Sequence, residues 1–280
     1  MSRYALRVAR RTLVHSFDDG FVHAGNFAYL SLLTLFPFFI LLSTVAGALG
    51  RTGEGLAAVH RFLEILPHNV AQFLAKPIND VLSQQNQQGL ITLGIIVGIW
   101  TIANFIETMR DILRRAHDIT AKRPFWHYRL GSMAMALGGV ILMLTAFSAQ
   151  MLITASEQFI TRLLPFAADL LGWLGISRLA PAVALFGALF LIFQTLTPMR
   201  YRLGCPKWPG ALLTTLIWLG TTMVLPIILS SLADYSLTYG SLAGVMIALL
   251  FFFIIGFGFV LGAELNAALA LEPKNMPKEG

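Results

Sequence analysis

The chain has 280 residues, of which 56% are hydrophobic and only 12% are charged, and its mean hydropathy is +0.72. A soluble domain carries about 25% charged residues. The composition therefore excludes an ordinary soluble globule, a disordered chain and a coiled coil, and the single cysteine, Cys205, excludes an internal disulfide. A helical membrane protein remains. The net charge of +6 is then explained by basic residues on the cytoplasmic side of the membrane, which face anionic lipid, and it does not require a nucleic-acid partner.

The N-terminal segment, residues 1–26, is basic and precedes the first long apolar run. We interpret it as a cytoplasmic segment and not as a cleavable signal peptide, because the run that follows is too long for a signal-peptide core. Residues 3–17 have roughly the apolar spacing of an interfacial helix. The pattern is imperfect because Arg3 and Arg10 fall within its apolar arc.

Six uncharged apolar runs follow, each of about 20 residues, the length of helix that crosses a hydrocarbon core of about 30 Å. The predicted spans are 27–49, 90–106, 131–155, 179–199, 209–233 and 241–263. These runs lack the period-two alternation of β-barrel strands. We therefore predict an all-α integral membrane protein with a six-helix transmembrane domain over residues 27–270 and a cytoplasmic tail at 271–280.

The first outer connection, residues 50–88, has helical apolar spacing that prolines divide. We predict short amphipathic helices in this periplasmic connection that lie on the outer leaflet or cap the bundle, with a gating role as the alternative. His60, Glu64 and His68 recur at four-residue spacing, as metal ligands on one helix face do. Because Pro67 interrupts that helix, we predict no metal site there.

Lys and Arg are distributed unevenly between the two sides of the predicted bundle. With the N-terminus inside, 15 of the 20 basic residues lie on the cytoplasmic side. The other five are Arg51, Arg61, Lys76, Arg162 and Arg178. Cytoplasmic connections of membrane proteins carry the excess of Lys and Arg. Both termini are therefore predicted to be cytoplasmic.

Eight polar residues lie within or beside the spans, at about one depth near the cytoplasmic side. They are Asn26, Asn104, Glu107, Arg110, Gln194, Arg200, Glu264 and Asn266. Polar groups are costly in a membrane, so each needs an explanation. Asn104, Glu107 and Arg110 share about one helix face. We interpret the set as a polar vestibule that binds a head group or an ion; the alternative is a structural network in which Glu107 pairs with Arg110 or an inner-loop arginine.

Pairs of small residues at four-residue spacing occur in three spans and allow helix backbones to approach closely. The pairs are Gly94 with Gly98, Ala184 with Ala188, and Gly258 with Gly262. We predict that they pack within the bundle and do not form a dedicated dimer contact. Pro37 predicts a kink in the first span.

The sequence contains no motif that indicates an enzyme. GxSxG, P-loop and GxGxxG patterns are absent, and His117, Asp118 and His127 lack a second ligand cluster. Before the third span, aromatic and basic residues mix: Phe125, Trp126 and Tyr128 with Arg123 and Arg129. Such residues stack on RNA bases in some proteins, but beside a span they indicate an interfacial belt. We therefore predict no catalytic residue, no metal and no cofactor.

Several motifs recur in a characteristic order: AYLSLLTLFP at 28–37, RPF at 123–125, WPGA at 208–211, YGSLA at 239–243 and LGAELNA at 261–267. Over about residues 20–270 this order resembles the YihY/BrkB family of bacterial inner-membrane proteins. The resemblance implies six helices and an inner-membrane location. It implies no settled activity, since members carry ribonuclease, virulence or lipid-transport labels. Glu264 and Asn266 fall on family motif positions.

The sequence thus favours a polytopic inner-membrane protein that acts as a transporter or handles lipid, with a polar or amphipathic solute at the inner polar residues. The first alternative is a scaffold or assembly partner whose basic loop, residues 110–129, docks a protein or anionic lipid. The second alternative is a membrane-bound ribonuclease. The expected partners are membrane lipids and the solute, with no nucleic acid, and a homo-oligomer is compatible with the sequence.

Overall fold

The computed structural model describes residues 2–18, 20–48, 71–72, 75, 88–119, 129–139, 176–202, 205–231 and 242–272. Within these ranges all regular secondary structure is helical and no strand occurs, as the sequence predicts. Several predictions concern residues outside the described ranges. They are nearly all of the first outer connection, including the three residues with the spacing of metal ligands, the aromatic loop at 120–128, and most of the third span.

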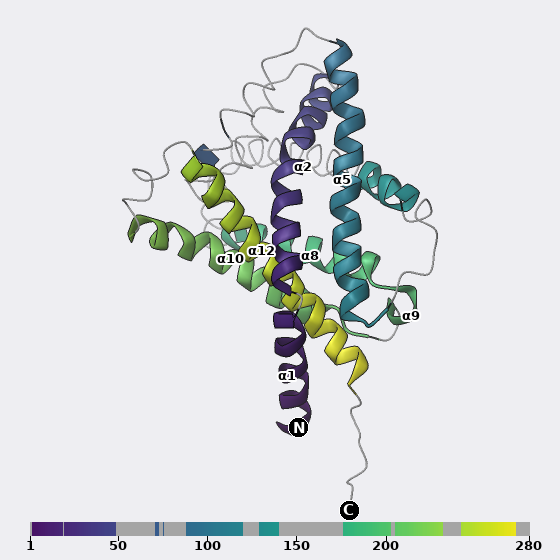
Figure 1. Ribbon diagram of the computed structural model, residues 1–280, viewed down its shortest axis with the longest axis vertical. Coiled ribbons are helices and arrows are strands. Elements are labelled where there is room, and N and C mark those ends of the chain that lie inside the picture. The colour runs from purple at the N-terminus through teal and green to yellow at the C-terminus, as the bar shows by residue number, and fades with distance from the viewer. Residues whose placement is uncertain are drawn as a thin grey trace, which may run out of the picture.

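Seven helices are bounded within the described ranges (Figure 1). They are α1 (Ser2–Asp18), α2 (Gly20–Ala48), α5 (Gln88–Ala116), α8 (Ile176–Leu196), α9 (Met199–Arg202), α10 (Trp208–Ser231) and α12 (Leu242–Leu271). Residues 129–139 are also helical. Five of these helices cover the first, second, fourth, fifth and sixth predicted spans, apart from a few residues at their ends.

Two helices of the described chain are long and apolar enough to cross a membrane, at Trp208–Leu225 and Ala243–Leu271. A shorter apolar helix lies at Ala182–Leu196. The predicted number of six transmembrane helices stays a prediction. α12 continues past the predicted end of the sixth span, so that Glu264 and Asn266 lie inside a helix.

α2 and α5 run antiparallel along most of their length (Figure 1). The Phe27 ring lies 4.8 Å from the Phe105 ring, and further along the same pair of helices Pro37 approaches Gly98. A Cβ added to Gly98 would lie 3.2 Å from the Pro37 carbonyl oxygen. Gly98 thus allows close packing inside the bundle, as predicted for its motif.

α12 occupies the centre of the bundle and contacts α1, α2, α5 and α10. Its Phe259 is fully buried between Phe27 of α2, 5.8 Å away between ring centroids, and Phe193 of α8, 5.0 Å away. These aromatic contacts place three helices around one core, which in a membrane is held by close van der Waals packing.

The seam between α10 and α12 is built from small residues. The Thr214 hydroxyl donates to the Gly258 carbonyl at 3.1 Å, and a Cβ on Gly262 would meet Thr214 Oγ1 and the Gly210 carbonyl. The prediction that Gly258 and Gly262 serve internal packing is confirmed. Ala184 and Ala188 differ, because both are exposed on α8 within the described chain.

α1 packs antiparallel on the C-terminal half of α12, at the lower end of the bundle in Figure 1. Near the C-terminal end of α1, the Phe17 ring lies 6.0 Å from the Phe257 ring of α12. At the other end of the contact, Arg7 and Arg11 each lie 3.8 Å from the Glu272 carboxylate. The opposite face of α1 exposes apolar side chains, as an interfacial helix would: Leu6, Leu13 and Phe17.

Candidate functional site

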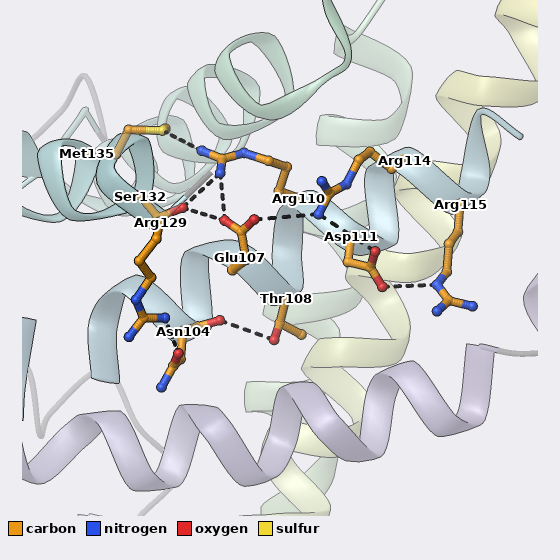
Figure 2. Close-up of polar contacts among 10 residues, drawn as sticks. All are labelled: Asn104, Glu107, Thr108, Arg110, Asp111, Arg114, Arg115, Arg129, Ser132 and Met135. Atoms are coloured by element: carbon orange, nitrogen blue, oxygen red, sulfur yellow. Dashed lines mark hydrogen bonds and ion pairs between the residues drawn. The ribbon is translucent and has the colours of Figure 1, made fainter. Parts of the chain in front are cut away.

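The α5 network is a group of ion pairs and hydrogen bonds centred on Glu107 (Figure 2). Glu107 Oε2 lies 2.6 Å from the Arg110 guanidinium and accepts a hydrogen bond of 2.5 Å from the Ser132 hydroxyl. Arg110 also donates to Ser132 at 2.8 Å, and Glu107 Oε1 lies 3.5 Å from Arg114. The carboxylate is therefore surrounded by donors from α5 and from residues 129–139.

Arg129 connects the beginning of the third predicted span to α5. Its guanidinium donates to the Asn104 side-chain oxygen and, at 3.1 Å, to the Trp100 carbonyl. It also lies 3.6 Å above the Trp100 ring, a cation–π geometry. Arg129 is only 3% exposed, so these contacts replace the water that a guanidinium would otherwise bind.

The outer part of the α5 network is more exposed. Asp111 lies 2.9 Å from Arg115 one turn along the helix and 3.7 Å from Arg114. The ten residues drawn in Figure 2 include four arginines and two acidic residues. The network therefore contains more positive than negative side chains. The side chains of Glu107, Arg110 and Arg114 are each at most a quarter exposed.

Asn266 joins α12 to the beginning of α10. Its side-chain oxygen accepts from the Gly210 amide at 2.9 Å, and its amide donates to the Lys207 carbonyl at 3.1 Å. The first amides of a helix lack partners within the helix, so a side-chain acceptor there acts as a cap. Both polar atoms of Asn266 are thus used in holding two helices together.

Glu264 lies two residues from Asn266, but its surroundings are different. The side chain is 8% exposed, and within the described chain Oε2 has no hydrogen-bond partner. On α1, the buried Thr12 and Ser16 hydroxyl oxygens also lack a hydrogen-bond partner among the described residues. The interface between α1 and α12 therefore contains polar atoms whose hydrogen-bonding capacity is not used by the described chain.

The connection from α8 to α10 is held by two basic side chains. Lys207 Nζ donates to the carbonyls of Tyr201, Arg202 and Cys205 at 2.6–2.8 Å. Arg202 donates to the Gln194 carbonyl at 3.0 Å, which satisfies an acceptor at the end of α8.

The eight residues predicted from sequence do not form a single network in the described chain. Glu107 and Arg110 form an ion pair on α5, and Asn104, one turn away on the same helix, bonds instead to Arg129. The other five are divided among three places: Glu264 and Asn266 on α12, Gln194 and Arg200 at the end of α8 and in α9, and Asn26 exposed on α2. Sequence reasoning missed Ser132 entirely and considered Arg129 only beside the aromatic loop.

The sequence profile of the family described as Virulence factor BrkB matches residues 14–279. The chain belongs to the BrkB family. The predicted resemblance is therefore confirmed, over nearly the whole chain.

Three relatives align with this BrkB-family chain over most of both lengths. One is "Putative ribonuclease-like protein YfkH" of Bacillus subtilis, 28% identical over 95% of each chain. Two are UPF0761 membrane proteins. The protein of Alteromonas mediterranea is 25% identical over 94% of this chain and 90% of the relative. The protein of Pseudoalteromonas translucida is 23% identical over 91% of this chain and 83% of the relative. No solved structure matches the chain significantly. The protein is a membrane protein of the BrkB/UPF0761 family.

The ribonuclease-like name belongs to the Bacillus subtilis protein. Within the described part of the BrkB-family chain, no three His, Cys, Asp or Glu side chains gather in a way that could hold a metal ion. The predictions of no metal, no cofactor and no catalytic residue stay predictions.

His117 lies at the C-terminus of α5, where specific backbone hydrogen bonds end the helix. The Asp118 amide bonds to the Arg115 carbonyl and the Ile119 amide to the Arg114 carbonyl, the paired bonds of a Schellman motif, and Asp118 has the positive φ of 55° that this motif needs. The His117 ring is buried, and its Nδ1 lies 2.8 Å from the Leu113 carbonyl oxygen. Asp118 in turn lies 2.7 Å from Arg11, so the helix end is tied to α1.

We expect His117 to contribute less to the thermal stability of the protein in mild acid than at neutral pH. Burial is the largest cause that lowers the pKa of His117 below the ordinary value of 6.5, against the raising effect of the Leu113 hydrogen bond. Folding therefore favours the neutral ring. The neutral ring stabilises the folded state at pH values above 6.5, and this stabilisation is lost as the pH falls through the lower pKa of the folded state. The unfolding midpoint of wild type should decrease more steeply between about pH 7 and 5 than that of His117→Gln; parallel curves would contradict this.

Proposed function

We propose that this BrkB-family protein is a multi-pass protein of the bacterial inner membrane, with both termini cytoplasmic, that transports or handles a polar or amphipathic solute. The solute binds at the α5 network on the cytoplasmic side. The orientation is supported by the distribution of Lys and Arg along the sequence. We propose no enzymatic activity, and metal-dependent RNA cleavage by the purified protein would contradict that.

The observation that carries this proposal is the excess of guanidinium over carboxylate in the less exposed part of the α5 network, where Arg110, Arg114 and Arg129 outnumber the one carboxylate of Glu107. A partly buried guanidinium binds a phosphate or carboxylate through two parallel hydrogen bonds, more strongly than it does in water. Glu107 holds Arg110 and Arg114 in place, and Arg129 contributes a third positive charge beside Asn104. The solute that suits this arrangement carries an anionic head group.

A scaffold without transport is the second candidate, and one observation favours it. Glu107 already receives hydrogen bonds from both Arg110 and Ser132, and a network that closes on itself needs no ligand. In that case the α5 network locks helix ends, and the basic residues after it dock a partner protein or an anionic membrane surface.

Native mass spectrometry of the purified full-length protein can separate the two functions. Wild type should retain phosphatidylglycerol in preference to phosphatidylcholine, and Arg110→Gln should reduce that preference about tenfold, equivalent to about 1.4 kcal/mol. Arg115→Gln is the matched control, because Arg115 lies on the same helix but its side chain is 60% exposed. Equal, unselective lipid adducts on all three proteins would overturn the binding site and favour the scaffold.

Binding alone does not establish movement. Proteoliposomes that contain wild type should move a fluorescent phosphatidylglycerol between leaflets faster than protein-free vesicles do, and Arg110→Gln should slow this movement. Selective binding without movement would restrict the function to lipid handling.

A further inference from the structure

Two glutamates that look alike in the sequence have opposite surroundings in the structure. Glu107 accepts from Ser132 and is paired with Arg110 and Arg114, which suits an ionised carboxylate. Glu264 is more deeply buried, and within the described chain no cation lies at ion-pair distance from it and Oε2 has no donor. A buried carboxylate without donors costs several kcal/mol, whereas the neutral acid costs much less and can itself donate a hydrogen bond.

The helix register places the two unpartnered hydroxyls of α1 at the level of Glu264. The Phe17 ring of α1 lies 6.0 Å from the Phe257 ring of α12, and from there the two helices run antiparallel towards the ion pairs at Glu272. Thr12 and Ser16 lie on α1 between Arg11 and Phe17, and Glu264 lies on α12 between Phe257 and Glu272. Ser16, and Thr12 one turn further, thus follow the same buried stripe of α1 that covers Glu264.

The charged and titratable groups around this interface already have partners. Arg11 of α1 and Asp118 after α5 are the charges that act on Glu264, and they form an ion pair of 2.7 Å. Arg11 also lies 3.8 Å from Glu272 on the same helix as Glu264. Lys207, before α10, donates to three backbone carbonyls, and His117 is bonded to the Leu113 carbonyl. Each of these groups therefore has a partner other than the Glu264 carboxylate.

We propose that Glu264 is a buried proton-binding site between α1 and α12, separate from the α5 network. In the docked state it is a neutral carboxylic acid, because the described part of the buried interface offers its Oε2 no hydrogen-bond donor and no cation at ion-pair distance. Release of the proton to water leaves a carboxylate that requires hydration, so ionisation loosens α1 from α12. The exchange makes and breaks only the carboxyl O–H bond, and the binding of H⁺ is thereby linked to the docking of α1.

Infrared spectroscopy of the full-length protein tests the protonation state directly. Wild type at neutral pH should show the carbonyl band of a neutral carboxylic acid, which is lost in Glu264→Gln and kept in the control Asp111→Asn. Glutamine has the shape of the neutral acid, so Glu264→Gln should fold. A wild-type spectrum without the band, or a band that persists unchanged in Glu264→Gln, would overturn the proposal.

The link to α1 is tested by thiol labelling in a Cys205→Ser background. Val8→Cys places a thiol on the buried stripe of α1, and Leu13→Cys places one on the exposed face as a control for thiol chemistry. The ratio of the two maleimide reaction rates should rise with pH when Glu264 is present and stay flat in Glu264→Gln. The same rise in both backgrounds would show that α1 undocks independently of Glu264. Neither test depends on an anionic solute at the α5 network, so each proposal can fail alone.

Discussion

Gly210→Ala should disrupt the packing of α10 on α12 and destabilise the protein by about 3 kcal/mol or more. A Cβ at this position would overlap the Gly262 carbonyl oxygen and the Asn266 side-chain amide. The first of these is a backbone atom of the central helix and cannot rotate away. The substitution would also disturb the hydrogen bond from the Gly210 amide to Asn266. Thermal unfolding in detergent, followed by intrinsic tryptophan fluorescence, together with size-exclusion chromatography, measures the effect.

Gly220→Ala is the matched control because it lies on the same helix. A Cβ at Gly220 meets nothing within 4 Å, and alanine is favoured over glycine in a helix by about 1 kcal/mol. Its unfolding midpoint should equal or exceed that of wild type. If the two variants are equally stable, the close contact between α10 and α12 is not present in the protein.

The positions of the helices could be predicted from sequence because they depend on local properties. An uncharged run of about 20 residues specifies a helix in a membrane whatever it packs against. The Gly258 and Gly262 pair likewise indicated a close helix contact. The partner of that contact could not be predicted, because Gly210 and Thr214 lie more than 40 residues away in the sequence and carry no signal that pairs them with α12.

The candidate site was predictable only where it lies on one helix. Asn104, Glu107 and Arg110 share a face by spacing alone; in the structure Glu107 pairs with Arg110, and Asn104 accepts from Arg129. Glu264 and Asn266 are two residues apart and so lie about 200° apart around the helix axis. Asn266 therefore meets the beginning of α10, whereas Glu264 lies on a different side of α12. The prediction placed Glu264 and Asn266 in one site because they are close in the sequence. The packing of helices that are distant in the sequence gives them different roles.

Glu107→Gln should destabilise the protein by about 2–4 kcal/mol. Removing the acid from a buried ion pair leaves an uncompensated charge, which costs about 3–5 kcal/mol for full burial. The lower range applies here because the Glu107 side chain is 24% exposed, while Arg110 is 14% exposed. Glutamine also keeps an acceptor for Ser132, so part of the network survives. The unfolding midpoint in detergent and the resistance to denaturant measure the loss.

The double variant Glu107→Gln/Arg110→Gln decides whether that loss comes from the charge pair. Glu107→Gln leaves the Arg110 guanidinium without its nearest carboxylate, and Arg110→Gln then removes that guanidinium. The double variant should therefore be more stable than Glu107→Gln alone.

Asp111→Asn controls for the net charge of α5. Asp111 is 41% exposed and pairs with Arg115 on the surface, where such pairs contribute about 0–1 kcal/mol. If Asp111→Asn costs as much as Glu107→Gln, the stabilisation belongs to the overall charge balance of the helix. If it costs little and the double variant recovers stability, the buried pair itself holds residues 129–139 against α5 through Ser132, and the arginines are positioned before any solute arrives.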